Sequence, residues 1–237
     1  MQIVSLTFHR FEGAGARLWA LGQMGLARRA LARVPGIGFW KLCGSGTGEG
    51  FTPLPNTAVY AILATWPDMG TARARTGGAP VFARRAARAA ETWTLFLQPV
   101  QARGAWSGAA PFEPEGAIPV GAPVAALTRA TVKPRVAARF WRRVPDISRV
   151  IGADPNVLFK IGIGEVPLLH QVTFSVWPDA ASMAAFARAD GPHARAVAAV
   201  RAGDWFAEEL YARFRVAGAR GTWGGTDPLA AKDAAAA

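Results

Sequence analysis

The chain has 237 residues, 51% of them apolar and 10% aromatic, which is enough for one large domain or two small ones with a substantial core. No apolar stretch reaches the roughly 18 residues that a membrane-spanning helix needs, and residues 1–6 alternate like a strand and not like a signal peptide. A single cysteine, Cys43, excludes an internal disulfide and a cysteine-rich metal site. We therefore expect a cytoplasmic protein without a membrane-spanning helix.

The net charge of +11 comes from 27 basic and 16 acidic side chains. Such an excess suits an acidic partner: nucleic acid, anionic lipid headgroups or a cofactor that carries carboxylates. Abundant Ala, Arg and Gly are also typical of a GC-rich genome, in which Arg replaces Lys. Nucleic-acid binding is not expected, because no helix-turn-helix, zinc-finger or RNP-type motif is present and the basic residues are scattered along amphipathic helices.

In the first half, a strand is predicted from Ile3 to Phe8, followed by a helix from Gly15 to Val34. The apolar positions of this helix include Leu18, Leu21 and Leu26. The glycine-rich stretch 44–50 lies between two predicted strands, and no helix follows it to receive a pyrophosphate. It is therefore expected to form a flexible loop at the mouth of a cavity.

The second half begins with a predicted strand from Val124 to Val132 and a helix from Arg135 to Val150 that Pro145 breaks or kinks. A further helix is expected to begin at Gly191-Pro192 and to reach Trp205. Three nearby acidic residues are also predicted to be helical, with the two glutamates pointing in different directions: Asp204, Glu208 and Glu209.

The chain contains a tandem repeat. A strand that ends in Trp66-Pro67-Asp68 is matched by one that ends in Trp177-Pro178-Asp179, where proline removes a ladder donor and aspartate caps the next helix. Further matched pairs are Arg103-Gly104 with Arg220-Gly221, Trp106 with Trp223, Trp93 with Trp205, and Lys41 with Lys160. Blocks that recur in the same order indicate two related halves.

Each half reads strand, helix, strand, strand, helix, strand, which is the order of a ferredoxin-like domain. We predict an α+β fold in which residues 1–106 and 124–226 are fused ferredoxin-like repeats, joined by a linker at 107–123 and followed by a disordered tail at 227–237. Central strands with bulk on both faces favour a dimeric-type α/β barrel within one chain, with a cavity between its sheets, over two separate sandwiches.

The chain has three histidines. His9 is expected at a solvated strand end, and His170 at the start of a strand, where a turn hydrogen bond would explain it. His193 follows Gly191-Pro192 at a helix start, where the first half has Val81. A helix start disfavours the imidazolium and keeps the ring neutral, as a metal or haem iron requires. His193 is therefore the candidate ligand of a single site in the second half, weighed against an exposed histidine at a helix start.

Several blocks resemble the spheroidene monooxygenase family of purple-bacterial carotenoid synthesis. They are Pro35 to Leu42, Gly44 to Phe51, Arg142 to Ile147, Phe159 to Glu165, Gln171 to Asp179, and Asp190 to His193. The resemblance extends from Met1 to about Gly225.

This resemblance implies an O2-dependent oxidoreductase that oxidises C-2 of acyclic carotenoids, turning spheroidene into spheroidenone by successive hydroxylation and loss of water. It also implies haem b, because no side chain attacks an unactivated allylic C–H bond, and an external electron donor such as a ferredoxin-like protein. We infer His193 as the axial iron ligand, with His170 as the alternative, and Lys160 and Arg195 as further cofactor-binding residues.

A carotenoid substrate further implies peripheral contact with an anionic photosynthetic or inner membrane. Two other interpretations stay open. One is a cofactor-free monooxygenase of the ferredoxin-like-barrel type, and the other is a carrier that binds haem or carotenoid without catalysis.

Overall fold

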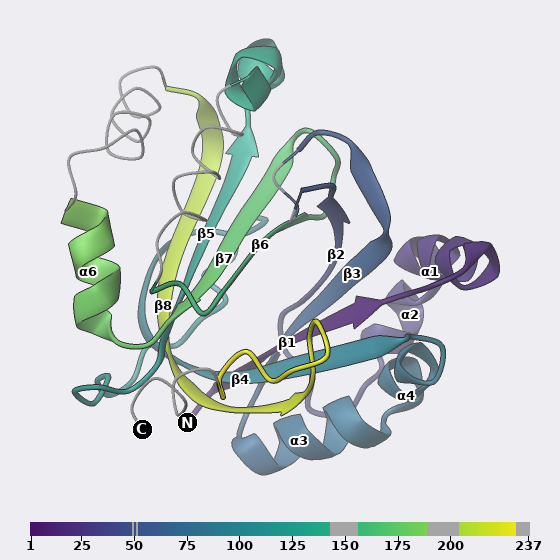
Figure 1. The fold of residues 1–237 in the computed structure, drawn as a ribbon, viewed down its shortest axis with the longest axis horizontal. Coiled ribbons are helices and arrows are strands. Elements are labelled where there is room, and N and C mark those ends of the chain that lie inside the picture. Colours follow the sequence, from purple (N-terminus) through teal and green to yellow (C-terminus); the bar gives the residue numbers. More distant parts are fainter. Residues whose placement is uncertain (49, 51, 143–155, 189–203, 231–237) are drawn as a thin grey trace.

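Eight antiparallel strands close into a barrel in the order β1-β3-β2-β6-β7-β5-β8-β4 (Figure 1). The structure, a computed structural model, describes residues 1–48, 50, 52–142, 156–188 and 204–230. The predicted α+β class and the single-chain barrel are therefore confirmed.

The elements follow one another in two runs that begin and end with a strand. The first half contains β1 (Ile3–Arg10), α1 (Ala14–Leu26), α2 (Arg28–Leu31), β2 (Trp40–Gly46), β3 (Pro55–Trp66), α3 (Met69–Gly78), α4 (Pro80–Ala86) and β4 (Glu91–Gly104). The second half contains β5 (Val124–Val132), the 3-10 helix η1 (Pro134–Val136), β6 (Phe159–Gly164), β7 (His170–Trp177), α6 (Ala180–Arg188) and β8 (Phe206–Gly221).

Both halves use the same strand order, β4-β1-β3-β2 in the first and β8-β5-β7-β6 in the second. Two seams join them. Strands β4 and β8 pair along their length, from Trp93 opposite Gly221 to Gly104 opposite Leu210. The β2–β6 seam holds only the pairs Gly44–Gly164 and Ser45–Ile163. The barrel is therefore least tightly closed between β2 and β6.

Alternate residues of each strand point into the barrel. Its interior contains a cluster of aromatic side chains, with ring centroids 4.8 Å apart for Trp93 and Phe159 and 5.3 Å apart for Phe8 and Phe159. Phe174 and Trp223 complete this cluster. The predicted cavity between the sheets is thus filled at this level by side chains.

Helices cover the two sheets unequally. In the first half, α1 to α4 lie against one side of the barrel, and α6 lies on the opposite side (Figure 1). The first layer buries Ile3, Leu31, Ile62 and Phe82 between helix and sheet. In the second half, α6 contributes Met183 to a smaller cluster with Val124 and Trp177. Among the residues that the structure describes, fewer helices therefore cover the outer face of the second sheet.

The matched blocks form matching local structures. The Asp68 side chain accepts a hydrogen bond from the Thr71 N–H at 2.8 Å, and the Asp179 side chain accepts one from the Ser182 N–H at 2.7 Å. Both helix caps are therefore confirmed. After β4 and β8 the chain turns alike, with isolated bridges between Trp106 and Ala109 and between Trp223 and Thr226.

Four predictions were wrong in detail. The first helix ends at Leu26, and a separate short helix follows it. Leu18, Leu21 and Leu26 point to solvent and not to the core. Glu208 and Glu209 lie in a strand, β8, because this segment pairs with β4 on one side and β5 on the other. Trp93 lies inside the barrel, whereas Trp205 precedes β8 and packs beside Val132 and Phe140.

The linker and the start of the tail both contact the core. Phe112, in the segment that joins the halves, is buried against Phe214, with ring centroids 5.1 Å apart. Leu229 packs against the barrel core, while residues 231–237 lie outside the described part. Within the described residues, no helix combines the length and the apolar character that crossing a bilayer requires.

Candidate functional site

A cleft of about 460 Å³ opens at the weak seam between β2 and β6. It is lined by Arg10, Ser45, Asn56, Val59, Val157, Leu158, Phe159, Lys160, Ile161 and Trp223. The floor is formed by the aromatic cluster through Phe159 and Trp223, and Arg10 lies at the rim with its guanidinium 4.6 Å from the Trp223 ring centre. The cleft therefore leads from solvent to an apolar interior. Its lining includes Ser45, within the glycine-rich stretch 44–50 that was predicted at a cavity mouth, and Asn56 beyond it.

Lys160, one of the predicted cofactor-binding residues, lines this cleft. The predicted match with Lys41 is wrong by one residue. Lys41 pairs with Leu63 in β3, whereas Lys160 pairs with Ser175 in β7, the counterpart of Ala64 and not of Leu63. Because side chains alternate along a strand, Lys41 points into the barrel and Lys160 points to the outer face of the second sheet.

That outer face differs sharply between the halves. Thr7 in β1 and Thr128 in β5 are equivalent, since each lies four residues after the residue that pairs with Trp66 or Trp177. Thr7 is 2% exposed beneath the helices, whereas Thr128 is exposed. Thr173 and Tyr211, the strand neighbours of Thr128, are half-buried. At these positions the outer face of the second sheet is therefore less buried than that of the first.

One buried polar atom on the same face has no partner. Gln171 in β7 is 8% exposed, and its Nε2 makes no hydrogen bond to the part of the chain that the structure describes. A buried amide donor normally has an acceptor, so an unsatisfied donor is unusual at this position.

The other predicted cofactor residues, His193 and Arg195, lie outside the described residues. His170 begins β7 as predicted, and its Nδ1 lies 3.3 Å from Glu165 Oε2. His9 contradicts the prediction of a solvated strand end: it is 1% exposed, in β1 beneath the helical layer. Cys43 is a buried core residue, and burial raises the pKa of its thiol, which disfavours the thiolate needed for iron ligation.

A polar network, the Glu165 network, closes one end of the barrel. Glu165 pairs with Lys41 at 3.0 Å and accepts a hydrogen bond from Trp106 Nε1 at 2.8 Å. Lys41 also donates to Ser107 Oγ at 2.6 Å. Carboxylate, ammonium and indole are thus mutually satisfied, and they connect the turn after β4 to the turn between β6 and β7.

A buried ion pair adjoins this network. Arg129 points inward from β5 with a side chain 1% exposed, and its Nη1 bonds to Glu208 Oε2 from β8. Glu208 also accepts hydrogen bonds from the Ser107 N–H at 2.9 Å and the Gly108 N–H at 2.7 Å. Burial raises the pKa of Glu208, but these N–H donors and the Arg129 charge outweigh burial and leave its pKa below the ordinary value.

Sequence reasoning missed this pair. Arg129 occupies the position equivalent to Phe8, which lies in the aromatic cluster of the first half. Side chains alternate along β5, so Arg129 points into the barrel with Ala125 and Leu127. A charged residue among inward-facing apolar residues was the sequence feature that could have indicated a buried ion pair. Glu208 gives no such signal, because the sequence predicts a helix at this position.

The buried imidazole of His9 makes stability depend on pH. Burial, and secondarily the Arg85 charge, lower the pKa of His9 to about 3, and Nδ1 lies 3.2 Å from Thr92 Oγ1. The unfolded chain binds a proton near pH 6.5 while the folded chain stays neutral. Stability is therefore lost as pH falls below about 6.5, by up to about 1.4 kcal/mol per pH unit.

Urea unfolding at pH 7.0 and pH 5.0 measures this effect. His9→Gln is expected to remove about 2 kcal/mol of the difference between the two pH values. Thr92→Val removes only the hydrogen bond to the ring and should keep the wild-type slope. An unchanged slope in His9→Gln would show that His9 is protonated in the folded state.

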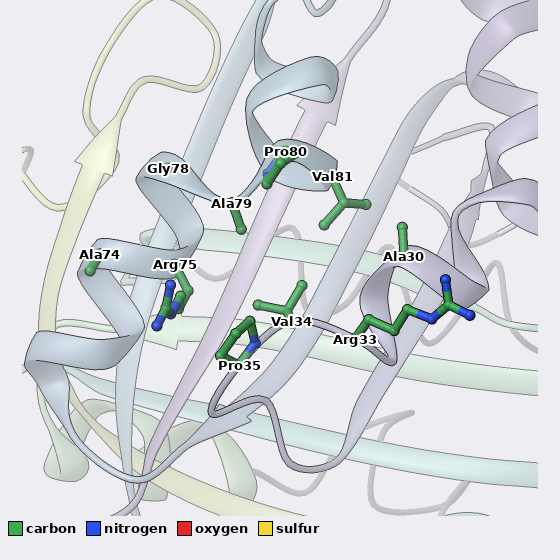
Figure 2. Close-up of a pocket in the computed structure, with 10 residues that line it drawn as sticks. All are labelled: Ala30, Arg33, Val34, Pro35, Ala74, Arg75, Gly78, Ala79, Pro80 and Val81. Carbon is green, nitrogen blue, oxygen red and sulfur yellow. The ribbon is translucent and has the colours of Figure 1, made fainter.

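A second hollow, of about 410 Å³, lies on the surface between α2 and the turn from α3 to α4 (Figure 2). Apart from Arg33 and Arg75 its lining is apolar or backbone, with Val34, Pro35 and Val81 facing the groove. Its lining residues include no acid, histidine or cysteine. This groove therefore lacks acid–base and metal-binding groups, and the seam cleft and second-sheet face form the better candidate site.

Comparisons with known proteins agree with this architecture. No family model matches the chain. The chain is 54% identical over 234 residues to the spheroidene monooxygenase of Rhodobacter capsulatus, covering 98% of this chain and 97% of the relative. It is 34% identical over 210 residues to that of Rubrivivax gelatinosus, covering 89% and 80%. A crystal structure of aldoxime dehydratase is similar with a TM-score of 0.61 at 11% identity, covering 91% of this chain and 81% of that one.

The likeness to aldoxime dehydratase concerns the fold alone. Fold and site together define an α+β protein with a closed, eight-stranded antiparallel barrel and a cleft at its weaker seam. At the sequence level the assignment is narrower: the chain belongs to the spheroidene monooxygenase family, and it is an oxygenase. The resemblance seen in its sequence blocks is thereby confirmed.

Proposed function

We propose that this chain oxidises C-2 of acyclic carotenoids with O2 and converts spheroidene into spheroidenone. The identity of 54% to the Rhodobacter capsulatus spheroidene monooxygenase, over nearly the whole chain, is the observation that carries this proposal. Each hydroxylation inserts one atom of O2 into a C–H bond and reduces the other to water, taking an electron pair and protons from an external donor, which we propose is ferredoxin-like. Two hydroxylations at one carbon give a gem-diol, and loss of water leaves the ketone.

We propose haem b as the cofactor, held against the outer face of the second sheet. When bound, haem supplies the O2 activation that no side chain provides. The exposed Thr128 on this face supports this location. Lys160 on the same face, together with Arg195, would hold the propionates, and His193 would ligate the iron. The alternative ligand, His170, alternates with Gln171 along β7 and would place the haem on the barrel side of the sheet instead.

The seam cleft is our proposed route for the carotenoid. The apolar part of its lining, including Val59, Ile161 and Trp223, suits a polyene end. The chain would work on the cytoplasmic side, peripheral to an anionic photosynthetic or inner membrane in which the substrate dissolves. The excess of basic residues supports this location.

We also infer that the barrel consists of two fused ferredoxin-like repeats, residues 1–106 and 124–226, with 107–123 as the linker and 227–237 as the tail. The equal strand orders of the two halves and their matching helix caps support this division. Only the second half would carry the cofactor, since the equivalent face of the first half is covered by helices.

Absorption spectra of the purified protein, produced with haem supply, test the cofactor assignment. Wild type is expected to show a Soret band, and His193→Ala to lose it with at least tenfold less bound iron, while His170→Ala keeps both. The reverse result would move the ligand to His170. A wild type without a Soret band that still turns over spheroidene would indicate cofactor-free catalysis, and a Soret band without turnover would indicate a carrier.

A further inference from the structure

Helix α1 exposes an apolar face that its own fold leaves uncovered. Eight large apolar side chains are exposed in the described part of the chain, and three of them lie on this one helix: Leu18 at 72%, Leu21 at 52% and Leu26 at 75%. Helical periodicity places Leu18 and Leu21 on one face with Gly22 and Gly25, beside Leu26. The outer surface of α1 is thus leucine and glycine where a soluble helix normally carries charges.

The inner face of α1 is already satisfied by the barrel. Ala20 is fully buried, and Ala16, Trp19 and Met24 pack against Phe11 and Tyr60. The leucines are therefore not exposed because the helix is turned the wrong way. They form a second apolar face on a helix whose first one is in use.

Positive charge surrounds this face. From Gly13 to Gly48 the sequence contains four arginines and one lysine and no acidic residue. Arg17 lies on α1 itself, and Arg28 and Arg29 begin α2. Two flanking indoles also contact arginine side chains. The Arg88 guanidinium lies 4.6 Å from the Trp19 ring centre, and that of Arg28 lies 5.6 Å from the ring centre of Trp40.

We propose that the outer face of α1 docks the protein on the surface of an anionic phospholipid bilayer. Leu18, Leu21 and Leu26 would insert among the acyl chains while the arginines contact the phosphates, as in interfacial amphipathic helices. A second protein copy is the less suitable occupant, because α1 and α2 contain no acidic residue to complement their own arginines.

Docking through α1 also places the seam cleft next to the lipid. Arg10, at the rim of the cleft, ends β1, and α1 begins only four residues later (Figure 1). The Phe11 N–H between them is fixed to β3 by a hydrogen bond to the Ala58 carbonyl at 2.8 Å. A bilayer-dissolved polyene would then pass from the membrane to the cleft without crossing water. This part of the inference rests on the proposed carotenoid function.

Vesicle co-sedimentation tests the docking surface independently of catalysis. Wild type is expected to bind phosphatidylcholine vesicles that contain phosphatidylglycerol, and to bind less to vesicles of phosphatidylcholine alone. It should also bind less at 0.5 M NaCl, because the Debye length is then only about 4 Å and the salt screens the charges. The triple variant Leu18→Ser, Leu21→Ser, Leu26→Ser should bind at least tenfold more weakly. The matched control Leu54→Ser, Val120→Ser removes two other exposed apolar side chains and should bind like wild type.

A second variant, Arg28→Gln with Arg29→Gln, keeps the leucines and should bind phosphatidylglycerol vesicles several-fold more weakly at low salt. With spheroidene in detergent micelles the triple leucine variant should turn over within twofold of wild type, and with spheroidene in vesicles at least tenfold more slowly. If neither protein turns over spheroidene, the proposed function fails while the binding result stands. Equal vesicle binding by wild type and the triple variant, or a wild-type dimer that the triple variant splits, would overturn the docking proposal.

Discussion

The free energy of unfolding is expected to fall by about 3 kcal/mol when Glu208 is replaced with alanine. The substitution removes the only carboxylate bonded to Arg129 within the described residues, and the Arg129 side chain is 1% exposed. A guanidinium left in the barrel without a counter-charge must be solvated or displaced, which is the costly way to break a buried pair. It also releases the Ser107 and Gly108 N–H groups that Glu208 binds.

Urea or thermal unfolding of Glu208→Ala measures this loss. Asp204→Asn is the control, because Asp204 forms an ion pair with Lys133 at the surface, with 75% of its side chain exposed, and little change is expected there. Since the folded pKa of Glu208 is lowered, its contribution is present above the ordinary carboxyl pKa and is lost as pH falls through the folded value. An alanine variant as stable as wild type would mean that water already solvates Arg129.

Replacing either Gly104 or Gly221 with alanine is expected to destabilise the barrel by about 3 kcal/mol or more. The two residues occupy the same place in the repeat, with φ of 89° and 88°. A Cβ would lie 2.1 Å from the Glu209 carbonyl oxygen at Gly104 and 2.0 Å from the Thr92 carbonyl oxygen at Gly221. Both the left-handed backbone and the contact with a neighbouring strand therefore require glycine.

Gly22→Ala is the matched control, because Gly22 lies inside α1 and a Cβ there meets no atom within 4 Å. That variant should be stabilised by about 0.5–1 kcal/mol through helix propensity. Equilibrium unfolding of the three variants gives the comparison. Losses of similar size at Gly104 and Gly221 would support equivalent roles in the two halves, whereas a tolerated alanine at either position would mean that the strand there can shift.

Local signals in the sequence predicted much of the fold. Proline followed by aspartate ends β3 and β7, because the first residue removes a donor and the second caps a helix within three residues. Such effects act over a few residues and need no tertiary information. The recurrence of these blocks was enough to indicate two halves, and the residues in them were enough to indicate the family.

The faces of the elements were harder to predict. The sequences around Lys41 and Lys160 are similar, but the two lysines differ by one residue in their strand register. Lys41 therefore points into the barrel and Lys160 points outward. The segment Phe206–Gly221 is rich in residues that favour helices, yet it forms β8 because β4 and β5 offer hydrogen bonds on both of its edges. Pairing between distant strands overrode local propensity.

The candidate site shows the same division. Sequence alone determined the repeat, the helix caps and the membership in an oxygenase family, because these depend on residue types in order along the chain. Only the tertiary structure decided that Arg129 meets Glu208, that His9 is buried, that Thr128 is open where Thr7 is covered, and that α1 turns its leucines outward. Each of these depends on which strand or helix lies next to the residue in space, and such neighbours are set by the closure of the barrel.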